Sequence, residues 1–267
     1  MARSSSASKS SSAPADAGVQ SAVQNRVHDR LIVGLDVDDV AAADAVVSRL
    51  GDAVRFYKIG KQLFVHAGPD VVRRVQATGA DVFLDLKFHD IPNTVAAAGV
   101  EAARLGVRIF NVHAAGGLTM MQRTAAEVDR VCRAEKLRRP KIIAVTVLTS
   151  LADADLAQVG VERTTGAQVV KLARLAKRAG LDGVVASPRE IGAIRRACGS
   201  DFLIVTPGVR PAGGDVHDQK RVLTPGAAIA AGADYLVVSR PVLAAADPVA
   251  AAEDIVTDMR RGARKRA

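Results

Sequence analysis

The stretch ATGADVFLDLKFHDIPNT, residues 77–94, holds in one place the pattern that decides the fold. A helical pattern ends at its start, Gly79 follows, and a run rich in Val and Leu begins at Asp81. Glycine suits such a helix end because it adopts the left-handed backbone without a Cβ clash. The same order of helix, glycine and strand returns at Gly106, Gly180 and Gly232. We therefore expect a repeated unit of one strand and one helix.

Eight short apolar runs have the composition of buried parallel strands. They are rich in Val and Ile and are continuous rather than alternating, as strands buried on both faces are. Helical patterns such as Thr94–Leu105 and Gln168–Ala179 lie between them. The runs are Leu31–Asp36, Val54–Ile59, Asp81–Leu86, Arg108–Val112, Ile142–Leu148, Gly183–Ala186, Phe202–Thr206 and Tyr235–Ser239. The pattern predicts an α/β protein with a single (β/α)8 TIM barrel over residues 26–259.

The two ends of the chain differ in composition from this body. Residues 1–25 are Ser/Ala-rich and of low complexity, so we expect a disordered extension. Residues 260–267 form a basic segment that holds five of the nine net positive charges, and we expect a solvated tail. The remaining body is only mildly basic, which suits a small anionic substrate better than a nucleic acid.

Several function classes are disfavoured by what the chain lacks. The segment after the first strand reads LDVD, residues 35–38, where a dinucleotide-binding protein would carry a glycine-rich fingerprint. Cys132 and Cys198 do not have the spacing of a disulfide framework or a zinc site. No run of about 18 apolar residues could span a membrane. We therefore expect a cytoplasmic protein with no membrane partner and no metal site.

Charged residues gather where the first three predicted strands end. The first predicted strand ends in Asp36, the second ends at Lys58, and the end of the third provides Asp85, Lys87 and Asp90. Active sites of such barrels lie at the carboxyl ends of the strands. Positions two apart in a strand point the same way, so Asp85 and Lys87 should both face the barrel mouth. Since unpaired charges there would be costly, the alternation of lysine and aspartate indicates a functional array rather than a structural one.

The loops after the last two strands predict a phosphate site. Such loops commonly grip phosphate in this fold, and arginine offers paired donors that match phosphate oxygens. The segment from Pro207 to Asp215 is long and rich in Pro and Gly, which indicates a lid. The candidate contacts are Arg210, Gln219, Arg240 and the backbone amides near Gly208 and Ser239.

Several of these motifs together resemble one family. The segment DLKFHDIPNT, residues 85–94, is similar to the signature of bacterial orotidine 5′-phosphate decarboxylases. The likeness extends, in the family's order, to GLDV at Asp36, YKIG at Lys58, AVTVLTS through Thr149, TPGVRPAGGD at Arg210 and SRPV at Arg240. It spans residues from about 30 to 250, nearly all of the expected barrel.

The resemblance implies a function and a set of roles. It implies conversion of orotidine 5′-monophosphate into uridine 5′-monophosphate, the last step of de novo UMP synthesis, without metal or organic cofactor. Lys87 matches the catalytic lysine of a charged tetrad. The other tetrad members are Lys58, Asp85 and Asp90. In a homodimer, Asp90, Ile91 and Thr94 would reach the partner's site.

The remaining matches concern substrate binding. Asp36 corresponds to the ribose contact and Thr149 to the pyrimidine contact. Arg210, Gln219 and Arg240 correspond to the phosphate grip. Ser239 stands where the family usually has glycine, and its amide can serve the phosphate only if its φ is negative.

Alternative functions remain open at this point. A related sugar-phosphate decarboxylase would bind Mg²⁺ through a further acidic strand end, whereas the second strand here ends in Lys58. A nucleic-acid-binding or scaffolding barrel would depend on the basic segment and bind in a salt-dependent way. A barrel that binds phosphate without catalysis is the third alternative. His89 and His113 receive no catalytic role, because a lone histidine is more often structural.

Overall fold

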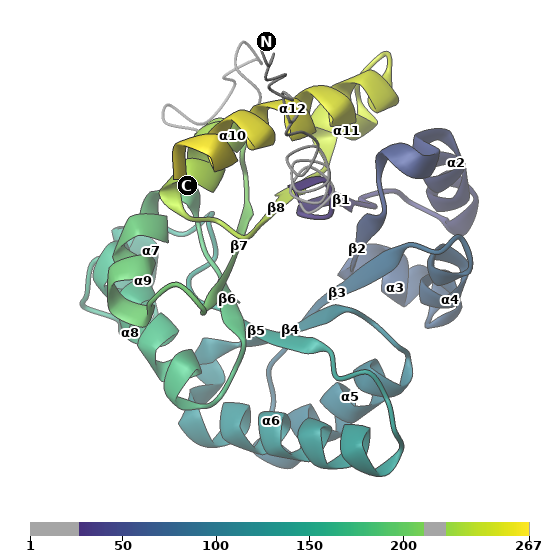
Figure 1. Cartoon of the computed structure of the whole chain (residues 1–267). Coiled ribbons are helices and arrows are strands. Elements are labelled where there is room, and N and C mark those ends of the chain that lie inside the picture. The colour runs from purple at the N-terminus through teal and green to yellow at the C-terminus, as the bar shows by residue number, and fades with distance from the viewer. Residues whose placement is uncertain (1–26, 211–222, 267) are drawn as a thin grey trace, which may run out of the picture.

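A computed structural model describes residues 27–210 and 223–266. Its eight parallel strands close into one barrel in chain order, and Figure 1 looks down this barrel. The strands are β1 (Leu31–Gly34), β2 (Phe56–Gly60), β3 (Asp81–Phe88), β4 (Ile109–His113), β5 (Lys141–Val145), β6 (Gly183–Val185), β7 (Leu203–Pro207) and β8 (Tyr235–Val238). The predicted TIM barrel is confirmed.

The helices form an outer ring around the strands (Figure 1). The left-handed glycines expected at helix ends are confirmed, since Gly79, Gly106, Gly180 and Gly232 all have positive φ. The helices are α2 (Val40–Leu50), α3 (Lys61–Ala67), α4 (Asp70–Ala77), α5 (Pro92–Arg104), α6 (Gly117–Ala134), α7 (Asp153–Gln158), α8 (Thr165–Arg178), α9 (Ile191–Cys198), α10 (Pro225–Ala231), α11 (Arg240–Leu243) and α12 (Pro248–Arg266). Short 3-10 turns are η1 (Gly51–Ala53), η2 (Ala114–Gly116) and η3 (Pro188–Glu190).

The strands are buried on both faces. A larger apolar cluster packs between strands and helices, and a smaller one fills the barrel interior. In β2, for example, Phe56 belongs to the interior cluster and Tyr57 to the outer one. This explains why the apolar runs are continuous. It also determines where polar residues can face the barrel interior. Residues two positions after the interior cluster point the same way and lie nearer the carboxyl ends of the strands, above the apolar floor that the cluster forms.

The basic C-terminal segment is helical, and its charged residues Arg261, Arg264 and Lys265 are exposed, as expected of a solvated segment. Residues 260–266 continue α12, so the expected boundary at residue 259 does not separate two structural units. A Cβ on Gly262 would lie 2.0 Å from the carbonyl oxygen of Gly226 in α10. The two backbones therefore touch at a point where a side chain has no room. The sequence did not indicate this packing, because Gly262 lies among basic residues that are typical of an exposed segment.

Two expectations fall outside the described residues. These are the Ser/Ala-rich extension, residues 1–25, and most of the expected lid, residues 211–215, together with Gln219. Within the described part of the chain, no helix has the length and apolar character needed to cross a membrane.

Candidate active site

Four charged side chains converge at the barrel mouth. Lys58 Nζ lies 3.1 Å from Asp36 Oδ1 and 3.4 Å from Asp85 Oδ2. Lys87 Nζ lies 2.7 Å from the other oxygen, Asp85 Oδ1. The side chains of Lys58 and Asp85 are each 12% exposed, and that of Lys87 is 26% exposed. Asp85 thus bridges two ammonium groups at the entrance to the barrel. We call Asp36, Lys58, Asp85 and Lys87 the charged array.

Register places this array directly above the apolar floor. Phe56 and Phe83 belong to the interior cluster, and Lys58 and Asp85 follow them by two positions on β2 and β3. Gly34 of β1 leaves the space that Lys58 uses, since a Cβ there would lie 3.2 Å from Lys58 Cε. The positions of Lys58 and Asp85 therefore follow from strand alternation and one small residue.

Lys87 reaches the mouth through an irregular backbone rather than by regular alternation. The β3–β4 register shifts between Leu84 and Phe88, and Lys87 has φ +54°. This left-handed conformation is uncommon for a residue with a Cβ. Asp85 and Lys87 lie together as expected, but the β3 irregularity, and not regular alternation alone, brings their side chains together.

The sequence reasoning missed Asn111 of β4. Its side chain is fully buried and donates to Asp85 Oδ1 at 2.7 Å. Its Oδ1 accepts the Lys87 backbone N–H at 2.8 Å. The available signal was a carboxamide inside an otherwise apolar strand, IFNVH, where an unpaired polar group would be costly.

The electrostatics of the mouth favour the ionised form of Asp36 and the neutral form of His113. Burial is the largest single influence on Asp36 and opposes its ionisation, but Lys58, a hydrogen bond with Ser239 and the more distant Lys87 together outweigh it, so the pKa of Asp36 lies below its ordinary value. Burial lowers the pKa of His113, and its neighbours His89, Lys61 and Lys87 lower it further. His113 therefore stays neutral near pH 7 and stacks against His89 with ring centroids 5.6 Å apart. Both rings flank the array and neither is paired with it in the contacts of the described residues.

The expected phosphate residues follow neighbouring strands. Arg210 lies shortly after β7, and its backbone N–H donates to Leu223 at 3.3 Å. Arg240 begins α11 directly after β8. Ser239 has φ −127°, so the condition set for its amide, a negative φ, is met. Because β7 and β8 pair side by side, the two arginines lie on segments that follow neighbouring strands at the same end of the barrel.

Thr149 lines a cavity of about 970 Å³ at this face. The cavity also touches Pro207 and Gly208 at the end of β7, and Ser187 after β6. Neither of the two expected phosphate arginines and no residue of the charged array is among the described residues that line this cavity. Among the described residues, no group of three or more His, Cys, Asp or Glu side chains is placed to hold a metal ion.

Comparison with known proteins assigns the family. Residues 29–255 match the model of the orotidine 5′-phosphate decarboxylase / HUMPS family. The chain belongs to this family. A relative from Syntrophotalea carbinolica, named orotidine 5′-phosphate decarboxylase, is 57% identical over 230 residues, covering 86% of this chain and 94% of that protein. One of the same name from Moorella thermoacetica is 54% identical over 242 residues, covering 90% and 96%.

A solved structure agrees with the fold and the family. The crystal structure of orotidine 5′-phosphate decarboxylase from Lactobacillus acidophilus superposes with a TM-score of 0.77 at 39% identity. It covers 86% of this chain and 98% of its own. The resemblance stated from the sequence motifs is thereby confirmed.

Three residues expected at a family dimer interface lie apart from the array. Asp90 is exposed, and its Oδ1 accepts the N–H of Ile91 at 2.6 Å. Ile91 is 65% exposed, and Thr94 in the first turn of α5 is exposed as well. The structure of one chain therefore does not bring Asp90 to Lys87, and the tetrad is incomplete within it.

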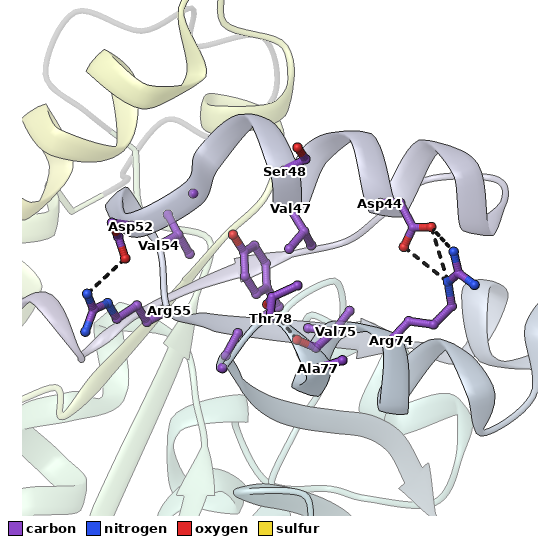
Figure 2. Close-up of a pocket in the computed structure, with 14 residues that line it drawn as sticks. Asp44, Val47, Ser48, Asp52, Val54, Arg55, Arg74, Val75, Ala77 and Thr78 are labelled. Atoms are coloured by element: carbon purple, nitrogen blue, oxygen red, sulfur yellow. Dashed lines mark hydrogen bonds and ion pairs between the residues drawn. The ribbon is translucent and has the colours of Figure 1, made fainter.

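A second groove, of about 830 Å³, lies on the outer wall of the barrel between α2 and α4 (Figure 2). Ion pairs of Asp44 with Arg74 and of Asp52 with Arg55 stand at its two ends. Tyr57 lines it from β2, and the Tyr57 hydroxyl has no hydrogen-bond partner among the described residues. None of the predicted site residues lines this groove, so it is separate from the family's active site.

Tyr57→Phe should be at least as stable as the wild type near neutral pH and more stable in alkali. Burial raises the pKa of Tyr57 to about 12, compared with about 10 in an unfolded chain. The folded state holds the proton of the Tyr57 hydroxyl more tightly than the unfolded chain does. The protonated hydroxyl therefore contributes to the free energy of unfolding below about pH 10, and this contribution is lost as the pH rises towards 12. Phenylalanine has no hydroxyl to ionise, so the variant should not lose this stability in alkali. The expected difference in the free energy of unfolding is on the order of 2 kcal/mol.

Urea unfolding near neutral pH and in strong alkali measures the difference. Tyr235→Phe is the matched control. An equal alkaline gain in both variants would contradict the prediction.

Proposed function

We propose that the chain decarboxylates orotidine 5′-monophosphate to uridine 5′-monophosphate, the last step of de novo UMP synthesis, without a metal or organic cofactor. One observation carries the proposal: Lys87 Nζ stands at the barrel mouth, 2.7 Å from a carboxylate that Lys58 also contacts. Relatives more than half identical carry the name of this activity.

The chemistry requires direct stabilisation of negative charge. Loss of CO2 breaks the bond between C6 and the carboxyl carbon and leaves the electron pair on C6. No neighbouring carbonyl delocalises this pair, and no cofactor acts as an electron sink. The ammonium of Lys87 is placed to stabilise the developing charge and then to donate its proton to C6. Asp85 forms an ion pair with Lys87 and repels the substrate carboxylate at the same time.

Substrate binding uses groups at a distance from C6. Arg210 and Arg240, with the Ser239 amide, would hold the phosphate, and Gln219 would join them. Asp36 would accept a hydrogen bond from the ribose, and Thr149 would contact the pyrimidine. Since these contacts are remote from the reacting bond, their binding energy can serve the transition state by ordering the closed site.

The proposal includes a homodimer and a cytoplasmic location. Ile91 is a large apolar side chain that is 65% exposed beside the exposed Asp90, as expected of residues that a second subunit covers. Asp90, Ile91 and Thr94 would then complete the partner's site. A monomer in sedimentation velocity at assay concentration would contradict the shared site. The two cysteines, Cys132 and Cys198, are buried free thiols, which suits a reducing compartment.

A spectrophotometric assay with and without EDTA tests the proposed function. We expect the absorbance of orotidine 5′-monophosphate to fall at the same rate in both conditions. A sugar-phosphate enzyme of the same family that depends on Mg²⁺ would lose turnover with the chelator. Absence of turnover on orotidine 5′-monophosphate in both conditions would reject the proposal.

A further inference from the structure

Asn111 is the one neutral side chain that contacts both members of the Asp85–Lys87 pair in the described structure. It is fully buried in β4, between the apolar residues Phe110 and Val112. Its two polar atoms have separate partners: Nδ2 donates to Asp85 Oδ1 at 2.7 Å, and Oδ1 accepts the Lys87 N–H at 2.8 Å. A buried carboxamide is costly unless it is paired, and here both of its ends are.

The contact to the Lys87 backbone falls where β3 departs from regular pairing. Leu84 pairs with Phe110 and Phe88 pairs with Val112, so the intervening part of β3 is longer than the part of β4 that it faces. Lys87 lies in this bulge with φ +54°. A residue with a Cβ remains in the left-handed backbone conformation only where its surroundings restrain it. The carboxamide oxygen of Asn111 supplies such a restraint.

The contact to Asp85 orients the counter-ion. Asp85 Oδ1 accepts from both Asn111 and Lys87 Nζ, and Oδ2 faces Lys58. Asn111 therefore fixes the carboxylate without adding a charge to the array. The same side chain restrains the backbone that carries the ammonium and the carboxylate that neutralises it.

We propose that Asn111 is a positioning residue for the reaction: it clamps the β3 bulge and Asp85 together, and so sets where the Lys87 ammonium stands. The inference rests on the proposed function. It also explains why Lys87 is held in the left-handed conformation. A charged group stabilises a transition state best when it is already in position and does not move during the reaction.

Asn111→Ala removes both restraints and should lower kcat by about 10²-fold, the cost of a displacement of about 1 Å at a reacting group. KM should change by less than about threefold, because the proposed phosphate and ribose contacts lie on the segments that follow β1, β7 and β8. Thr124→Val is the matched control. Thr124 is also a fully buried polar residue, but it bonds to Met120 within α6. It should leave kcat unchanged.

Asn111→Asp gives a readout that a purely structural residue would not change. It keeps the acceptor for the Lys87 N–H but sets a second carboxyl group against Asp85. Two adjacent carboxyl groups share a proton, so one of their pKa values rises strongly. Once protonated, the new carboxyl can donate to Asp85 as the carboxamide did. We therefore expect kcat of this variant to recover, relative to wild type, as the pH falls.

The outcomes separate this inference from the function beneath it. Wild-type protein that fails to turn over orotidine 5′-monophosphate overturns both. Active wild type with an equally active Asn111→Ala overturns the clamp alone. So does a loss that appears in KM and not in kcat. If Asn111→Ala does not fold, Asn111→Asp decides, because it has nearly the same shape. A pH profile of kcat parallel to that of the wild type would then refute the clamp.

Discussion

Lys87→Ala should lower kcat for orotidine 5′-monophosphate by about 10⁴-fold, because one ammonium both stabilises the C6 anion and protonates it. Uridine 5′-monophosphate should still bind within about tenfold of the wild-type affinity, since its phosphate and ribose contacts are untouched. Steady-state assays with high enzyme concentration and calorimetric titration of the product measure the two quantities.

The protein offers a matched control for this change. Lys136 is the other non-glycine residue with positive φ in the described chain, at φ +55°. Lys136→Ala removes a lysine from the same unusual backbone conformation but lies after α6, outside the array. It should leave kcat unchanged. Ordinary turnover in Lys87→Ala, or equal losses in both variants, would remove Lys87 from the mechanism.

The effect should be on chemistry rather than on folding. The Lys87 side chain is 26% exposed, and without it Asp85 keeps Lys58 at 3.4 Å and Asn111 at 2.7 Å. The carboxylate is thus not left unpaired, so the cost to the free energy of unfolding should be no more than about 1 kcal/mol. Far-UV circular dichroism and urea midpoints close to wild type would separate lost catalysis from lost structure.

The strands were predictable because burial on both faces leaves a continuous apolar run. The charges at Asp36, Lys58, Asp85 and Lys87 stood out for the same reason, as polar residues at the ends of such runs. The strand limits were less predictable, and β5 ends at Val145 rather than at Leu148. The hydrophobic pattern indicates which residues are buried. It does not indicate where the hydrogen bonding between neighbouring strands ends.

Other features depended on partners that a linear sequence does not reveal. The bulge at Lys87 becomes visible only when β3 is paired with β4. The proposed positioning role of Asn111 depends in turn on that bulge. Gly262 resembles a helix breaker within a charged segment until its contact with Gly226 explains it. Asp90 remains a prediction, since its role needs a second copy of the chain.

Asp85→Asn should lower kcat by about 10³-fold, the upper range for removal of one group that organises charge in an active site. The side chain keeps its size and can still accept from Asn111. It no longer separates two ammonium groups, so Lys58 and Lys87 repel each other. The ammonium of Lys87 then loses the carboxylate that holds its position, so it stabilises the C6 anion less well. Steady-state kcat of the variant and of the wild type measures this loss.

The same substitution should also reduce stability, in contrast to Lys87→Ala. Removing one partner from a buried pair costs about 3–5 kcal/mol. Here Lys58 retains Asp36 and the mouth admits water, so about 2 kcal/mol is expected. Asp70→Asn, which breaks the exposed pair with Arg73, is the control and should change neither kcat nor the urea midpoint. A stable, fully active Asp85→Asn would mean that Lys87 needs no counter-ion to hold its position, and the electrostatic account of the reaction would fail with it.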